Sequence, residues 1–120
     1  MLIYIAGPYR SDPVGNTRKA IDAWKVLKDA GYTSHVPHLS FQIDLIYPQT
    51  PEFWLDYDLV ILEKCDLLLR VPGFSLGADD EVRFCEAHDI PVFCGTAEQF
   101  VKADIDLERF GVKRIERGRF

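Results

Sequence analysis

The feature that most constrains the fold is a nearly continuous apolar run from Cys65 to Val71, with three consecutive leucines at its centre. Such runs are typical of central strands in parallel sheets, because these strands are buried on both faces. The run stops at Pro72-Gly73, a pair that ends regular structure. The sequence therefore predicts a buried strand at the middle of a parallel sheet.

Strand-like and helix-like segments alternate along the rest of the chain, which favours a parallel sheet covered by helices. The other expected strands are 2–6, 32–36 and 90–94, and the expected helices are 13–30, 51–64, 78–89 and a short one that Thr96 caps and that ends near 103. Residues 37–50 show little periodicity and are expected to form a long loop, a candidate lid or substrate-binding loop. The end of the chain is expected to form an edge strand around 112–115 or a mobile tail over 113–120.

A chain of 120 residues is the size of one domain. The order of elements predicts an α/β fold over residues 1–120, a flavodoxin-like or Rossmann-like doubly wound open sheet of four or five parallel strands. In such sheets, ligands bind beyond the carboxyl ends of the strands, where the strand order reverses.

Composition excludes several classes of partner. With 14 basic and 19 acidic side chains the formal charge is −5, which disfavours binding of a nucleic acid polymer. No apolar run approaches the ~20 residues that span a bilayer, and the N-terminus lacks signal-peptide features, so we expect a cytoplasmic protein with no membrane partner. Cys65, Cys85 and Cys94 are expected to be buried, reduced thiols.

Two strand ends carry the residues that suit a ligand site. The first strand is followed by Gly7-Pro8-Tyr9-Arg10, and the central strand by Pro72 to Gly77. Gly73 and Gly77 permit close approach of the backbone to a ligand, and Ser75 precedes a helix N-terminus, where unpaired N–H groups favour an anion such as phosphate. The alternative is that the glycines only shape a turn and that Ser75 only caps the helix.

Three acids follow, and the helix dipole alone accounts for acidic residues in a first turn. Glu81, however, lies beside the expected buried stripe of Ala78 and Cys85, so its carboxylate is expected near the crevice, ionised as a nucleophile would be. Asp79 is expected to point away and to pair with Arg83 at i, i+4.

These segments together resemble a known family. Tyr4-Ile5-Ala6-Gly7-Pro8, Asp58 eight residues before Asp66, and Ser75-Leu76-Gly77 followed after three residues by Glu81 are similar to the nucleoside 2-deoxyribosyltransferase superfamily. Within it, the Ser-Leu-Gly-x-x-x-Glu pattern is closest to the deoxynucleoside 5'-monophosphate N-glycosidases. The resemblance covers about residues 2–94.

The resemblance implies cleavage of an N-glycosidic bond without a cofactor or metal, in a homodimer or higher homo-oligomer. By position, Glu81 matches the nucleophile that forms a covalent glycosyl-enzyme, and Asp58 matches the acid that handles the leaving base. Tyr4 matches a tyrosine near the sugar. The residues that match the 5'-phosphate site are Gly7, Arg10, Ser75 and Gly77.

This chain departs from the base-exchanging transferases, which typically carry Asp-Ser-Gly-Thr where it has Phe74-Ser75-Leu76-Gly77. That difference favours a hydrolase of nucleotides over a transferase acting on nucleosides. Asp80 beside Glu81 is atypical, and its charge is expected to raise the pKa of the nucleophile. A non-catalytic nucleotide-binding or sensing module and a flavin carrier are the alternatives from other classes.

Two further groups invite a functional interpretation. His35 and His38 are expected to serve in loop hydrogen bonding or base contact rather than as metal ligands, since no third ligand lies beside them. The aromatic side chains expected to pack in the core or at a dimer interface, or to stack on a base, are Phe41, Tyr47, Phe53 and Trp54.

Overall fold

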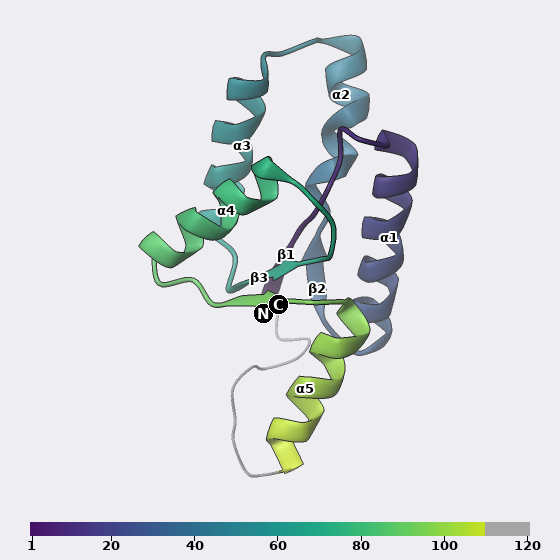
Figure 1. Ribbon diagram of the computed structural model, residues 1–120, viewed down its shortest axis with the longest axis vertical. Coiled ribbons are helices and arrows are strands. Elements are labelled where there is room, and N and C mark those ends of the chain that lie inside the picture. Colours follow the sequence, from purple (N-terminus) through teal and green to yellow (C-terminus); the bar gives the residue numbers. More distant parts are fainter. Residues whose placement is uncertain (110–120) are drawn as a thin grey trace.

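The computed structural model describes residues 1–109 of the chain. The expected edge strand around 112–115 and the tail 113–120 lie outside the described residues. Within them, ten elements follow one another, with one or more helical segments between successive strands, and the two faces of one sheet are covered by helices (Figure 1).

The sheet has four parallel strands in the order β2 (Thr33–His35), β1 (Leu2–Ala6), β3 (Leu67–Arg70), β4 (Val92–Cys94). The first strand, β1, is therefore internal, the second strand lies at one edge, and the third and fourth strands follow on the other side of β1. This is the flavodoxin-like, doubly wound order, and the predicted fold class is confirmed. The strand order reverses between β1 and β3, which places a ligand crevice beyond their carboxyl ends.

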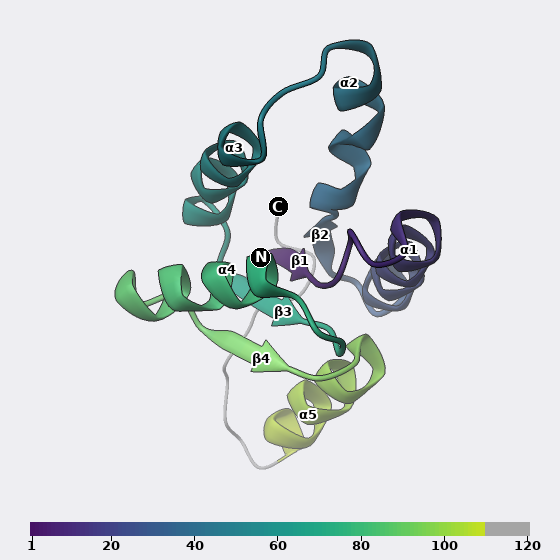
Figure 2. The same cartoon turned by 45° about the horizontal axis from the view of Figure 1, so that its top comes forward.

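Helices α1 (Pro13–Asp29) and α5 (Ala97–Arg109) cover one face, and α3 (Pro51–Glu63) and α4 (Leu76–Ala87) cover the other (Figure 2). Successive side chains of a strand point to opposite faces. Accordingly, Ile3 and Ile5 of β1 pack in the core under α1 and α5, whereas Tyr4 packs in the core under α3 and α4.

Side-chain oxygens cap three of the helices, two of them at Ser75 and Thr96, where the sequence indicated a cap. Thr50 Oγ1 accepts from Phe53 N at 3.1 Å, Ser75 Oγ accepts from Ala78 N at 3.1 Å, and Thr96 Oγ1 accepts from Gln99 N at 3.1 Å. These bonds satisfy N–H groups that the first turn of a helix leaves without partners. α4 begins slightly earlier than expected and α5 continues to Arg109 rather than ending near 103.

The segment expected to be a long loop is largely helical, which corrects the prediction for 37–50. It contains a 3-10 turn, η1 (Pro37–Ser40), followed directly by the short helix α2 (Phe41–Ile46). α2 has six residues and none of them is buried, so the sequence lacks the periodic pattern of apolar residues that marks a helix packed on a core. Asp44 Oδ1 joins α2 to α3 by accepting from Trp54 Nε1 at 2.7 Å.

The cysteines divide into two environments. Cys65 and Cys85 are buried free thiols, as expected, but Cys94 at the end of β4 is exposed, which corrects the prediction for that residue. Among the strands of residues 1–109 it ends an edge strand, which pairs with β3 on one side. Among residues 1–109, no helix combines the length and apolar character needed to cross a membrane.

Candidate functional site

Tyr4 and Glu81 form the centre of the site. Tyr4 lies in the middle of β1 with its side chain fully buried, and its hydroxyl donates a hydrogen bond to Glu81 Oε2. Glu81 is carried by α4, one helical turn from each of the buried residues Ala78 and Cys85. The packing of α4 on the sheet therefore directs this carboxylate inward, as the sequence predicted.

The charge state of Glu81 differs from the expectation. Burial raises the pKa of Glu81 to about 7, and the negative charges of Asp58 and Asp80 act in the same direction. The hydrogen bond from Tyr4 and the positive charge of Arg70 oppose this rise. The prediction of a readily ionised carboxylate was wrong, because loss of hydration outweighs the helix N-terminus. The expected contribution of Asp80 is present but is the smallest of these.

Asp58 is the second carboxyl group of the site. It lies on α3 and is half-buried, and its Oδ1 atom is buried without a hydrogen-bond partner among the described residues. Burial raises the pKa of Asp58 to about 7. Its charge acts on both Tyr4 and Glu81, so the three predicted residues share one electrostatic environment. Two carboxyl groups that titrate near neutrality can divide acid and base roles between them.

A cavity of about 530 Å³ opens beside this group, at the β2 edge of the sheet. Its polar surface comes from Ser34, His35, Ser40 and Asp58, and its apolar surface includes Trp24 and Tyr57. The other lining residues are Ile21, Val36, Pro37, Leu39 and Ile43. Ser34 Oγ, like Asp58 Oδ1, is buried without a partner in the described part of the chain.

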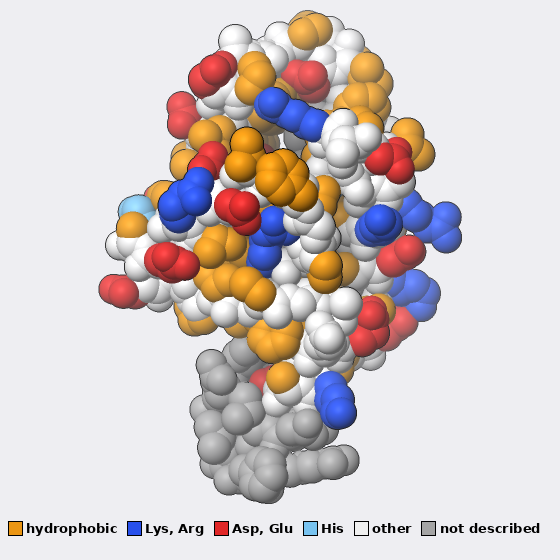
Figure 3. All heavy atoms as spheres, viewed as in Figure 1, with side chains coloured by type: hydrophobic (Ala, Val, Ile, Leu, Met, Phe, Trp, Pro, Cys, Tyr) orange, Lys and Arg blue, Asp and Glu red, His pale blue; other side chains and the backbone are white. Residues whose placement is uncertain are grey.

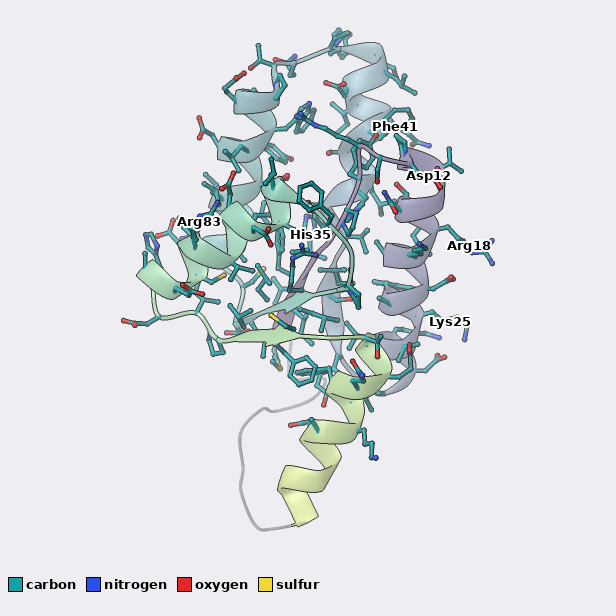
Figure 4. The ribbon with its side chains drawn as sticks, in the orientation of Figure 1. Asp12, Arg18, Lys25, His35, Phe41 and Arg83 are labelled. Carbon is teal, nitrogen blue, oxygen red and sulfur yellow. The ribbon has the colours of Figure 1, made fainter. Side chains whose placement is uncertain are left out.

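His35 connects the cavity to the buried pair. It stands beside Tyr4 in the sheet register, and the two ring centroids are 5.8 Å apart. Burial lowers the pKa of His35, which favours the neutral imidazole. Figure 4 shows His35 between α4 and α1, whereas Arg18 and Lys25 extend outward from α1.

The loop from Pro72 to Gly77 faces the turn after β1, as predicted for neighbouring strands. Gly73 has φ +121°, and a Cβ atom there would lie 2.6 Å from Pro8 Cγ. Gly77, in the first turn of α4, has open space where its Cβ would be. The Ser75 hydroxyl accepts from Ala78 N, so its capping role is observed.

The two remaining predicted phosphate residues lie in different surroundings. A Cβ atom on Gly7 would lie 2.4 Å from Val71 Cγ2, so packing between β1 and the end of β3 already requires glycine there. Arg10 is exposed in the turn that leads to α1. Within residues 1–109 its guanidinium has neither an ion pair nor a hydrogen bond in the structure.

Arg70 is the residue of this region that the sequence did not single out. It ends β3, its side chain is 12% exposed, and its Nη2 atom lies 3.1 Å from Asp79 Oδ1. The predicted Asp79–Arg83 pair is therefore wrong, because Arg83 pairs with Asp80 instead. A lone arginine directly after three leucines was the available signal.

Among the described residues, the hydrogen bonds and ring contacts of His38 and of the other predicted aromatic residues are with residues other than Tyr4 and Glu81. His38 Nε2 is 3.0 Å from the Pro8 carbonyl oxygen, so the expected loop hydrogen bond is observed. Phe53 and Trp54 contact each other on α3 with ring centroids 5.1 Å apart, and Trp54 binds Asp44. Phe41 contacts Tyr9, with 6.2 Å between ring centroids.

Exposed apolar side chains gather on α2, on the residue that follows it, and on α3. The most exposed of them are Leu45, Ile46, Tyr47 and Val60. Figure 3 shows hydrophobic side chains over α2 and the start of α4, while charged side chains dominate along α1. No group of three or more His, Cys, Asp or Glu side chains within the described residues is arranged to hold a metal ion.

The fold and this site define a flavodoxin-like α/β domain in which a buried tyrosine donates a hydrogen bond to a half-buried glutamate beside a cavity. The chain belongs to the family described as a domain of unknown function, DUF7768, which matches residues 1–94. The matched part ends with β4 and includes every residue of the site described above.

Comparison with solved structures gives a similarity to the glutaminase domain of Trypanosoma brucei CTPS with bound acivicin, at 17% sequence identity and a TM-score of 0.45. The aligned part covers 91% of this chain and 40% of that one, so this chain spans well under half the length of that protein. No curated protein matches this chain in sequence.

Proposed function

We propose that this protein is a cytoplasmic N-glycosidase that hydrolyses the bond between base and sugar in a nucleoside 5'-monophosphate, with the deoxy form preferred. The observation that carries the proposal is the part-buried hydrogen bond from Tyr4 to Glu81, close to a second carboxyl group, the half-buried Asp58. The resemblance of these positions to the nucleoside 2-deoxyribosyltransferase superfamily supports the same chemistry. It also favours hydrolysis over base exchange.

In the first step, the ionised Glu81 carboxylate attacks the anomeric carbon of the sugar. A carbon–oxygen bond forms, the carbon–nitrogen bond breaks, and its electron pair leaves with the base. Protonated Asp58 supplies a proton to the departing base, which makes the base a better leaving group. The pKa of Asp58 near 7 keeps a large part of this carboxyl group protonated at neutral pH.

In the second step, a water molecule attacks the same carbon and displaces Glu81. The water transfers a proton to the carboxylate of Asp58, which restores both groups to their starting states. Tyr4 donates its hydrogen bond to Glu81 before the first step and again after the second step has freed the carboxylate. Because the pKa of Tyr4 is raised far above its ordinary value by burial, its hydroxyl remains a donor throughout.

The cavity beside Asp58 is the proposed position of the base. Its lining combines the aromatic side chains of Trp24 and Tyr57 with the polar side chains of Ser34 and Asp58. A flat ring with a hydrogen-bonding edge matches that combination of groups. The 5'-phosphate is assigned to the first turn of α4, where Gly77 leaves open space, and Arg10 of the turn after β1 is proposed as its cationic partner.

The proposed working form is a homodimer or a higher homo-oligomer. Leu45 at 63%, Ile46 at 72% and Tyr47 at 71% exposure leave an apolar surface at the end of α2 that association would cover. The mass in solution, measured by light scattering, tests this part of the proposal separately from the chemistry.

A nucleotide-binding module without turnover is the second candidate. The raised pKa of Glu81 favours it, because a protonated carboxyl group binds a sugar hydroxyl but does not attack carbon. Such a module would bind nucleotides saturably and release no base. It would also tolerate Glu81→Gln with little change in affinity.

The test is chromatographic detection of free base after incubation with a panel of ribo- and deoxyribonucleoside 5'-monophosphates. Glu81→Ala is the control for the nucleophile, and Glu86→Ala is the matched control, since Glu86 is an exposed residue on the same helix. Base release that disappears only in Glu81→Ala supports the glycosidase. Saturable binding without base release from any nucleotide would favour the binding module.

A further inference from the structure

The end of β3 places an arginine where an apolar residue would be expected from the preceding run. Alternation along the strand puts Leu67 and Leu69 in the core under α1 and α5, and puts Leu68 in the core under α3 and α4. Arg70 falls on the same side as Leu68. It therefore points toward α4, the helix that carries Glu81.

The guanidinium of Arg70 makes three kinds of contact at once. Nη1 donates to the Val71 carbonyl oxygen at 2.6 Å, Nη2 donates to the Gly73 carbonyl oxygen at 2.9 Å, and Nη2 and Nε reach Asp79 Oδ1 at 3.1 and 3.4 Å. The first two contacts hold the loop after β3, and the third holds the first turn of α4. The fork of an arginine can satisfy these partners together, whereas a lysine ammonium cannot.

This position also matters for the charge at Glu81. The groups that act on Glu81 come from every element packed around it: Tyr4 of β1, Asp58 of α3, Arg70 of β3, and Asp80 on α4 itself. Cys85 of α4 also lies within electrostatic range of Glu81. Among these groups in the described residues, Arg70 alone is cationic.

We propose that Arg70 is a positioning residue of this site, which fixes the loop from Pro72 to Gly77 against the start of α4 and keeps a largely covered positive charge within electrostatic range of the Glu81 carboxylate. It does not touch the substrate in this role. Its effect on turnover rests on the proposed function, but its effects on the loop and on Glu81 are present in the resting protein.

The experiment compares Arg70→Met, Arg70→Lys and the parent protein without any substrate. Carbon-13 NMR of labelled glutamate side chains, assigned with Glu81→Gln, gives the titration midpoint of Glu81. Hydrogen exchange of the amides from Gly73 to Ala78 reports how firmly the loop and the first turn are held. Arg83→Met is the matched control, because Arg83 is an exposed arginine on α4 that pairs with Asp80.

Arg70→Met is expected to raise the Glu81 midpoint by roughly 1 pH unit and to speed exchange in the loop about tenfold or more. Arg70→Lys keeps the charge but not the fork, so it is expected to restore the midpoint and to leave the loop exchange fast. Arg83→Met is expected to change neither. If Arg70→Met does not fold, Arg70→Lys alone decides the loop assignment through exchange.

The proposal is overturned if loop exchange in the folded Arg70 variants equals that of the parent, or if Arg70→Met folds and leaves the Glu81 midpoint in place. Failure of the proposed function has a different signature: wild-type protein then releases no base from any nucleotide, while both resting-state measurements can still respond to Arg70. With an active wild type, the acidic limb of the rate profile is expected to move with the Glu81 midpoint in Arg70→Met and to stay in place in Arg70→Lys.

Discussion

The Tyr4 hydroxyl donates its hydrogen bond to Glu81 Oε2 across 77 residues of sequence, from the middle of β1 to α4. This contact joins β1, a central strand of the sheet, to α4, the helix that follows β3. Because burial keeps Tyr4 protonated, the bond favours the ionised form of Glu81 against the larger effect of burial. The reactivity assigned to Glu81 therefore depends on a residue in the centre of the sheet.

Tyr4→Phe removes this donor while keeping the ring that packs in the core. The pKa of Glu81 is expected to rise further, so base release at pH 6 should fall by about tenfold or more. At pH 8 the loss should be smaller, about twofold for a pKa that rises by 1 unit, since about half of Glu81 is then still ionised in the variant. A pH series of initial rates checks this, and an equal loss at both pH values would assign Tyr4 a different role.

The rate of base release is expected to follow a bell-shaped pH profile with its maximum near pH 7. Activity requires ionised Glu81 and protonated Asp58, and burial raises the pKa of each to about 7. Below the maximum Glu81 takes up a proton, and above it Asp58 loses one. Asp58→Asn should remove the alkaline limb and lower the rate by roughly 10² to 10⁴. Persistence of that limb in the variant would exclude Asp58 as the acid.

Stability should depend on pH through Glu81. Its pKa in the fold, about 7, lies above the ordinary value of 4.5, so folding favours the protonated form. The contribution is complete below about pH 4.5 and is lost as the pH rises through 7. Glu81→Gln mimics the protonated form and should stabilise the protein by about 1–3 kcal/mol at pH 8, with little effect at pH 4.5.

Urea denaturation at the two pH values measures this difference. Glu86→Gln is the control, because Glu86 is exposed on the same helix and should show no comparable dependence on pH. The same stabilisation by Glu81→Gln at both pH values would contradict a raised pKa.

The two glycines around Ser75 should respond differently to alanine. Gly73 has a positive φ, and a Cβ atom there would lie 2.6 Å from Pro8 Cγ, so Gly73→Ala should lower the free energy of unfolding by about 1–3 kcal/mol.

A Cβ atom at Gly77 would have no atom within 4 Å, so Gly77→Ala should change stability by less than about 1 kcal/mol, in either direction. If the space beside Gly77 receives the phosphate, Gly77→Ala should nevertheless weaken nucleotide binding. Thermal melts with and without nucleotide separate these effects, and unchanged binding would place the phosphate elsewhere.

The sheet could be predicted because its signals are local. The leucines at 67–69 indicate a strand buried on both faces, and Ser75 and Thr96 mark helix starts by hydrogen bonds within three residues. α2 escaped prediction because it is short and wholly unburied, so neither length nor periodicity distinguishes it from a loop.

The grouping of Tyr4, Asp58 and Glu81 was predictable from the sequence, but the role of Arg70 and the electrostatics of the candidate site were not. Asp79 could pair with Arg83, four residues later on its own helix, or with Arg70 at the end of β3. Only the tertiary structure determines that its partner is Arg70. The helix N-terminus argues for an ionised Glu81, but the depth at which α4 packs on β1 determines that burial dominates. Neither fact is present in local spacing.

The covalent step gives the most direct test of the central claim. Protein mixed with the nucleotide that releases base fastest is quenched within milliseconds, and its intact mass and peptides are measured. The account predicts an adduct of one 5-phosphodeoxyribosyl group, mapped to Glu81 and absent from Glu81→Gln. Base release that persists in Glu81→Gln, with no adduct on Glu81 in the parent protein, would contradict it.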